Sequence, residues 1–213
     1  MYQGFLFDLD GTLVDSLAVV ETAWTQWGER HGIAREDILA FIHGKQAITS
    51  LRHFLPHADD STLREEFLWL EHLESTTLDG IIALPGAREL LTFLTDQAIP
   101  WAIVTSGSLP VASARYQVLG LPQPKVFITA EQVEKGKPHP DPYLLGAERL
   151  NLRPERCVVV EDAPAGIESG LAAGCAVVAV NAAQDTAHLR PTLRLNNLAD
   201  IVISLEPQGF TLS

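Results

Sequence analysis

Short apolar runs that alternate with helical patterns constrain the fold of this chain more than any other feature. The runs are continuously apolar, which indicates strands covered on both faces, as in a parallel sheet. We expect strands at residues 3–7, 101–105, 126–129, 157–161, 176–180 and 201–203. Apolar periodicity with proline and glycine punctuation predicts helices at 87–97, 110–119, 141–150 and 165–173. The alternation predicts an α/β fold, a Rossmann-like three-layer core around a parallel sheet.

Residues 16–80 interrupt this alternation, because they contain no strand-like run. Their apolar spacing predicts helices at 16–31, 35–43, 45–55 and 61–77, the first opened by Asp15 and Ser16 as N-cap residues. We therefore expect two domains. The core consists of residues 1–15 and 81–213, and an α-helical domain of residues 16–80 is inserted after the first strand.

Charge and cysteine content narrow the function classes. The chain has 27 acidic and 15 basic residues, a formal net charge of −12, so we expect no nucleic acid and no membrane surface as a partner. Cys157 and Cys175 lie in apolar runs, where buried free thiols are expected and a bridge is the alternative. Neither a signal peptide nor a membrane-length apolar stretch is visible. We expect a cytoplasmic monomer.

Polar residues stand where the predicted strands end. In an open parallel sheet, ligands bind beyond the carboxyl ends of the strands, so these residues are expected to converge on one rim. They are Asp8 and Asp10 after the first strand, Thr105-Ser106-Gly107 after the second, Lys137 shortly after the third, and Glu161-Asp162 at the fourth. Each alone could be a turn, a cap or a surface residue, but their common placement favours a site.

Convergence of these residue types suits phosphoryl transfer. Neighbouring acids repel one another unless a cation lies between them, and carboxylate and carbonyl oxygens suit Mg²⁺. Asp8 could attack phosphorus and form an acyl phosphate. Asp10 could protonate the leaving alkoxide and later activate water. A hydroxyl, a lysine and backbone N–H groups suit phosphate oxygens.

The same residues resemble the four signature motifs of the haloacid dehalogenase-like hydrolase superfamily. The motifs are Asp8-Leu9-Asp10-Gly11-Thr12, the apolar run into Thr105-Ser106-Gly107, Gly136-Lys137-Pro138, and Val-Val-Val-Glu161-Asp162. The resemblance extends from residue 4 to about residue 180, and the inserted helices resemble the cap of the helical-cap class. The chain looks most like small sugar-phosphate phosphatases. The resemblance implies an Mg²⁺-dependent enzyme whose partner is a small phosphorylated metabolite, a sugar or polyol phosphate.

The resemblance also implies roles for the core residues. Asp8 corresponds to the nucleophile and a metal ligand, and Asp10 to the general acid/base, which gives its backbone carbonyl to the metal. Thr105 corresponds to the residue that binds the transferring phosphoryl group, with help from the Ser106 backbone. Lys137 corresponds to the lysine that orients the nucleophile and the phosphate.

Further residues complete the implied site. Asp162 corresponds to a metal ligand, and Glu161 to a further ligand or to a partner that holds the ligands in place. In the inserted helices, His43-Gly44-Lys45 resembles the loop that sets substrate specificity. We expect His43 and Lys45 to take part in substrate binding, with Lys45 as a contact to the sugar.

The sequence leaves alternative functions open. Dehalogenases of the superfamily lack the second aspartate, so Asp10 favours phosphoryl transfer. Sugar-phosphate mutases of the β-phosphoglucomutase type are similar, but they carry a histidine five residues after the residue that matches Asp15, where this chain has Val20. A phosphate-binding module without catalysis is the remaining alternative, although binding alone does not need both Asp8 and Asp10.

Overall fold

A six-stranded parallel sheet forms the centre of the computed structural model, which describes residues 1–182 and 184–213. Within these residues the strand order is β5-β4-β1-β6-β7-β8. The strands are β1 (Gly4–Phe7), β4 (Trp101–Val104), β5 (Val126–Ile128), β6 (Cys157–Glu161), β7 (Ala176–Val180) and β8 (Leu193–Leu195). Every residue of β1, β4 and β6 is buried, which explains their continuous apolarity. The α/β class with a parallel sheet is confirmed.

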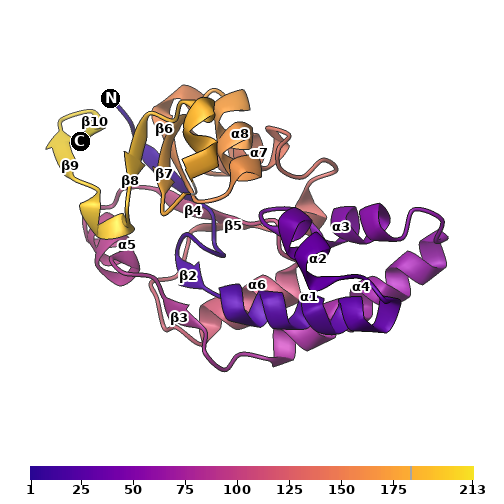
Figure 1. Cartoon of the computed structure of the whole chain (residues 1–213). Coiled ribbons are helices and arrows are strands. Elements are labelled where there is room, and N and C mark those ends of the chain that lie inside the picture. Colours follow the sequence, from indigo (N-terminus) through magenta and orange to yellow (C-terminus); the bar gives the residue numbers. More distant parts are fainter. Residues whose placement is uncertain (183) are drawn as a thin grey trace.

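Helices cover both faces of this sheet, which makes three layers (Figure 1). They are α5 (Ala87–Asp96), α6 (Leu109–Gln117), α7 (Asp141–Arg149) and α8 (Pro164–Ala172). Phe5 and Phe7 of β1 pack in one cluster with residues of α5 and α6, while Leu6 packs in a second cluster with residues of α7 and α8. Alternate residues of β1 thus reach opposite layers, as the pleat of a strand requires.

The segment between β1 and α5 is helical, apart from a short ladder where the chain leaves the core and returns. The ladder pairs β2 (Val14–Asp15) with β3 (Ile82–Ala83) in antiparallel fashion. Between them lie α1 (Leu17–His31), α2 (Arg35–Ile42), α3 (Ala47–Phe54) and α4 (Asp60–Thr76). In Figure 1 these helices stand to one side of the sheet. We call them the helical segment.

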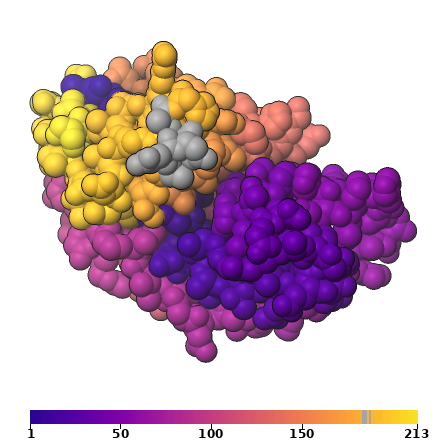
Figure 2. All heavy atoms as spheres, in the orientation of Figure 1, coloured from indigo at the N-terminus to yellow at the C-terminus, as the bar shows by residue number. Residues whose placement is uncertain are grey.

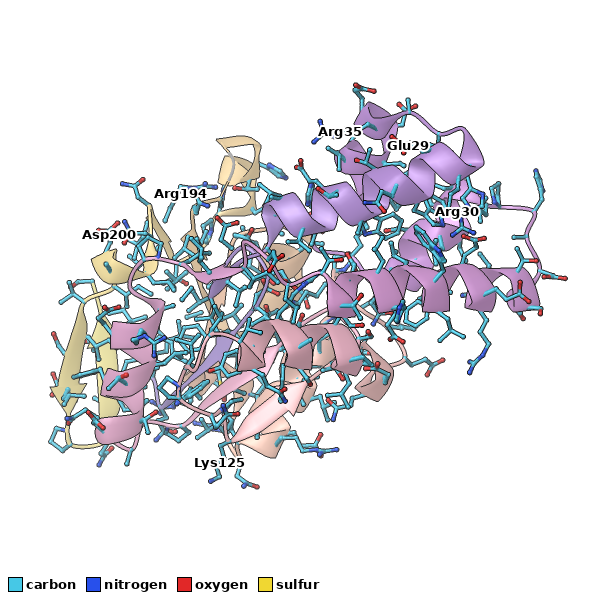
Figure 3. All side chains as sticks on the ribbon, turned by 90° about the horizontal axis from the view of Figure 1, so that it is seen from below. Glu29, Arg30, Arg35, Lys125, Arg194 and Asp200 are labelled. Atoms are coloured by element: carbon cyan, nitrogen blue, oxygen red, sulfur yellow. The ribbon has the colours of Figure 1, made fainter. Side chains whose placement is uncertain are left out.

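The helical segment has a core of its own. Trp27, Leu51 and Leu70 are fully buried within it. Surface contacts also join its helices: the Arg30 guanidinium of α1, labelled in Figure 3, lies 4.1 Å from the centre of the Trp69 ring of α4. The helical segment thus has a hydrophobic cluster that is separate from the two clusters of the sheet.

The carboxyl-terminal region differs from the prediction. Residues 201–203 do not form a strand of the main sheet. Instead β9 (Ile203–Glu206) pairs with β10 (Gly209–Leu212) in a separate antiparallel hairpin. The edge position of the sheet is taken by β8, whose three residues Leu-Arg-Leu are only partly buried or exposed and give little apolar signal. Short 3₁₀ helices complete the described chain: η1 (Ala130–Gln132), η2 (Pro154–Arg156), η3 (Gln184–Leu189) and η4 (Leu198–Asp200).

Two further sequence expectations concern the cysteines and the membrane. Cys157 and Cys175 are free and buried, and burial raises the pKa of the Cys157 thiol to about 11. The bridge, the alternative for these cysteines, is not formed. Among the described residues, no helix has the length and apolarity to cross a bilayer.

Candidate active site

The predicted motif residues meet at the carboxyl edge of the sheet. Asp8 follows β1 directly, Thr105 follows β4, and Glu161 is the last residue of β6. Strands β4 and β6 flank β1, so these side chains come together. Lys137 arrives from the loop between β5 and α7.

Lys137 links three parts of this edge. Its ammonium group donates to Asp8 Oδ1 at 2.7 Å, to Glu161 Oε1 at 2.6 Å and to the Val104 carbonyl at 3.0 Å. Burial acts to lower the pKa of Lys137, but the carboxylates of Asp8 and Glu161 outweigh it and hold the pKa above its ordinary value. The lysine therefore stays cationic and fixes the Asp8 carboxylate.

Glu161 is held through both of its carboxylate oxygens. Oε1 accepts from Lys137 and from the Tyr143 hydroxyl at 2.7 Å. Oε2 accepts from the backbone N–H groups of Asp162 and Ala163 at 3.1 and 3.3 Å. Glu161 thus orients its neighbours, and its oxygens are already engaged.

A cluster of acids at this edge fits a hard divalent cation. One carboxylate oxygen each from Asp8, Glu161 and Asp162 lies within 4.8 Å of the others. Burial, with Glu161 next in weight, raises the pKa of Asp8 to about 7, although Lys137 opposes the shift. Burial and the neighbouring acids also raise the pKa of Asp162 well above its usual range. This buried negative charge is what an oxygen-ligated Mg²⁺ would offset.

Asp10 points away from that cluster. Its Oδ1 accepts from the Ser16 hydroxyl at 2.6 Å and from Arg115 Nη1 at 2.9 Å. The sequence predicts that Ser16 caps the following helix. It lies at the N-cap position but makes no side-chain capping bond, because its hydroxyl serves Asp10; the Leu17 N–H bonds Asp15 Oδ1 at 3.3 Å.

Thr105 and Ser106 form a loop beside these acids. Thr105 is 4% exposed, and its Oγ1 accepts the Gly107 N–H at 3.1 Å. The Ser106 hydroxyl donates to the Gly44 carbonyl at 3.1 Å. That bond joins the rim of the sheet to the loop between α2 and α3, so the helical segment rests directly on the core.

A cavity of about 510 Å³ lies between the helical segment and this rim. Asp8, Asp10, Thr105 and Asp162 line its core side. Apolar side chains line much of the rest: Leu17, Val20, Trp24, Ile42, Phe67 and Val111. Figure 2 shows the indigo and purple helical segment seated against the core. The volume is in the range of pockets that hold small molecules.

His43 and Lys45 also line this cavity. The Lys45 ammonium donates to the Phe41 carbonyl at 2.6 Å and lies 4.3 Å from the centre of the Phe41 ring. His43 Nε2 lies 3.9 Å from Glu21 Oε1, and burial lowers the His43 pKa. The bond to Phe41 uses one of the three N–H donors of the Lys45 ammonium.

Sequence reasoning missed Arg115 and Glu74. Arg115 Nη2 lies 3.4 Å from Glu74 Oε1 of α4, and both side chains line the cavity. Burial raises the pKa of Glu74 to about 7, although the Arg115 charge opposes this. One feature of the sequence could have pointed to Arg115: it is a charged residue on the apolar face of a helix. Arg115 shares the buried face of α6 with Ala112 and Tyr116.

Comparison with known proteins agrees with this geometry. Residues 2–174 match the model of the haloacid dehalogenase-like hydrolases. The chain belongs to this family. It is 61% identical to Hexitol phosphatase A of Escherichia coli over 208 aligned residues. The alignment covers 97% of this chain and 96% of that protein.

One further sequence relative and one solved structure extend the comparison. Identity to 2-deoxyglucose-6-phosphate phosphatase 1 of Saccharomyces cerevisiae is 34%, over 84% of this chain and 80% of that protein. A β-phosphoglucomutase from Clostridium difficile shares the fold with a TM-score of 0.84 at 22% identity, covering 93% of this chain and 92% of that one. The hydrolase family and the close relationship to phosphatases make this chain an enzyme, a phosphatase.

Proposed function

We propose that this phosphatase hydrolyses small sugar or polyol phosphates through an aspartyl-phosphate on Asp8, with Mg²⁺ bound by Asp8, Asp162 and the Asp10 backbone carbonyl. The observation that carries the proposal is that Asp8 and Asp10, two residues apart on one loop, have different hydrogen-bonding partners. Asp8 is held by Lys137 within the acidic cluster, whereas the Asp10 carboxylate is turned toward Arg115 and Ser16. Pairs of acids in unlike environments are typical of a division between nucleophile and acid/base.

The reaction follows from these positions. Asp8 attacks phosphorus, and the bond to the ester oxygen breaks while Asp10 gives that oxygen its proton. In the second half, Asp10 takes a proton from water, which attacks the aspartyl-phosphate and releases inorganic phosphate. The Thr105-Ser106 loop holds the phosphoryl oxygens, while Lys137 keeps the Asp8 carboxylate in place for attack. When bound, Mg²⁺ supplies positive charge that lets one anion approach another.

The helical segment supports the choice of a small substrate. We propose that residues 16–80 act as a domain that closes over the core of residues 1–15 and 81–213, excludes water and opens for product release. The Ser106–Gly44 bond supports a closed arrangement. His43 and Lys45 stay proposed substrate contacts, and a cytoplasmic monomer stays a prediction.

The names of relatives support the substrate class. The proteins most similar in sequence include phosphatases named for a hexitol and for 2-deoxyglucose 6-phosphate. A cavity that mixes polar groups at the rim with apolar walls suits a polyol chain or a sugar ring. The test is a panel of phosphorylated metabolites and phosphopeptides assayed for phosphate release with Mg²⁺ and with EDTA. We expect hexitol and hexose phosphates to lead the panel and EDTA to abolish turnover; a preference for phosphopeptides would overturn the substrate class.

A mutase is the second candidate, favoured by the likeness to β-phosphoglucomutase. Against it, Val20 occupies the position of the mutase histidine and presents an apolar side chain to the cavity. A hexose 1-phosphate supplied with a trace of hexose bisphosphate separates the two. Release of inorganic phosphate supports the hydrolase, whereas an isomer formed without phosphate supports the mutase.

A further inference from the structure

Arg115 occupies a position where an apolar residue would be expected. It lies on the buried face of α6, one turn beyond Val111 and Ala112 and next to Tyr116. Its side chain is only 3% exposed. Removal of a guanidinium from water costs several kcal/mol unless partners offset it, so a chain that keeps one here has a use for it.

The guanidinium reaches the catalytic loop through Nη1, which donates to Asp10 Oδ1 at 2.9 Å. The Ser16 hydroxyl donates to the same oxygen at 2.6 Å. Two donors thus converge on Oδ1 and leave Oδ2 available. Oδ2 faces the loop proposed to hold the phosphoryl group, since a Cβ built on Gly107 would lie 4.0 Å from it.

The other side of the guanidinium faces the helical segment. Nη2 lies 3.4 Å from Oε1 of Glu74, a buried residue on α4. Glu74 and Asp10 therefore bind the same arginine from the helical segment and from the core. Nη2 and Nε have no hydrogen-bonding partner among the described residues, so Asp10 holds the best-formed bond that Arg115 makes.

We propose that Arg115 is a positioning residue for Asp10, holding Oδ1 so that Oδ2 faces the leaving-group oxygen, with Glu74 tying this arrangement to the helical segment. The inference rests on the proposed function, because it assigns Asp10 the role of acid and base. Lys137 cannot take this role, since its ammonium is shared among Asp8, Glu161 and the Val104 carbonyl. A merely structural role, in which Arg115 joins α4 to α6, is the alternative.

First-turnover kinetics separate the two roles. An alkoxide leaving group needs a proton from Asp10, whereas p-nitrophenolate leaves without one. For Arg115→Met in Mg²⁺, we expect the first-turnover release of hexitol from a hexitol phosphate to slow about 100-fold, within the range of general acid catalysis. The first-turnover release of p-nitrophenol should change less than about 3-fold, followed by slow steady turnover because water attack also needs Asp10. KM should change little.

Controls make the outcome decisive. Arg88→Met removes an exposed arginine that bonds the carbonyls of Leu119 and Gly120, and it should leave both rates unchanged. Should Arg115→Met fail to fold, Arg115→Lys is the second variant, because it keeps the charge but loses the planar guanidinium. In Arg115→Lys, first-turnover release of hexitol should slow about 10-fold while release of p-nitrophenol stays nearly unchanged. Equal slowing of both first turnovers, or no slowing, overturns the inference.

Asp10→Asn distinguishes failure of the inference from failure of the proposed function. If Asp10→Asn slows hexitol release selectively and the Arg115 variants do not, Asp10 is the acid and Arg115 is only structural. If Asp10→Asn itself shows no selectivity, Asp10 is not the acid, and the proposed function and the inference both fall.

Discussion

Two aspartates that are two residues apart have different surroundings, and the partner of each explains its role. Asp8 is bound to a lysine that is shared with Glu161, so its carboxylate is fixed inside the acidic cluster. Asp10 is bound to an arginine that is shared with Glu74, so its carboxylate is fixed outside the cluster. The residue type is the same, and the neighbouring cation decides the direction in which each carboxylate faces.

Loss of the Asp8 carboxylate should abolish turnover. Asp8→Asn keeps the shape of the side chain but removes the nucleophilic oxygen, and we expect kcat to fall by at least about 10⁴-fold. Circular dichroism should show an unchanged fold, and Asp37→Asn at an exposed position of α2 is the matched control. Full activity in Asp8→Asn would contradict the aspartyl-phosphate mechanism.

Glu74 should make stability depend on pH. Its pKa is about 7 in the folded chain against an ordinary value of 4.5, so the folded state holds the proton more tightly. Stability from this group is complete below about pH 4.5 and is lost as the pH rises through 7. Glu74→Gln cannot titrate, so its free energy of unfolding lacks this loss. Between pH 5 and pH 8 the difference in unfolding free energy between Glu74→Gln and wild type should therefore shift in favour of the variant by up to about 3 kcal/mol. Urea unfolding in EDTA measures this; a constant difference across that range would contradict it.

At the scale of elements, the sequence predicted the buried strands and the helices between them well. Strands covered on both faces must be continuously apolar, and β6 shows why this pattern is readable: Cys157 and Val158–Val160 are all fully buried. The edge strand β8 was missed because its three residues, one of them Arg194, are partly buried or exposed and leave no such pattern.

The site was predictable to the extent that its residues follow strands. Asp8, Thr105 and Glu161 follow or end adjacent strands, so their convergence needed only the parallel order. Arg115 and Glu74 could not be found in this way, because they meet only where α4 packs on α6, and nothing in the local sequence records that crossing.

The first turn of α8 should matter for activity through its close approach to Glu161. A Cβ on Gly166 would overlap the Glu161 carboxylate, so Gly166→Ala must displace the group that holds Lys137. Gly170 lies in the same helix, but a Cβ there meets Val159 and Val177 instead. We expect both alanine variants to lower the free energy of unfolding by about 1–3 kcal/mol.

Only Gly166→Ala should also lower kcat per folded molecule, by about 10-fold or more, because it alone moves a side chain that orients the site. The measurement pairs chemical denaturation with active-site-normalised kinetics for the two variants. Equal kcat values in Gly166→Ala and Gly170→Ala would show that the position of Glu161 does not matter to the reaction.

At the scale of the whole molecule, the chain must bind an anion although its net charge is −12. The buried cations at the site do not resolve this conflict, because Lys137 and Arg115 are each already shared between two acids. The proposed divalent ion would supply further positive charge, and the acidic cluster of Asp8, Glu161 and Asp162 offers it a place near the phosphate.

Magnesium should therefore stabilise the folded chain as well as activate it. The folded state gathers the acids and the unfolded state does not, so Mg²⁺ at about 100 times its dissociation constant should add about 2.7 kcal/mol, a rise of roughly 5–10 °C in Tm. Asp162→Asn should lose most of this rise, whereas Asp96→Asn, at an exposed position of α5, should keep it. Thermal unfolding at constant ionic strength makes the comparison, because diffuse attraction of cations to an acidic surface would act equally on both variants. An equal rise in Asp162→Asn and Asp96→Asn would mean that the acidic cluster is not where the ion binds.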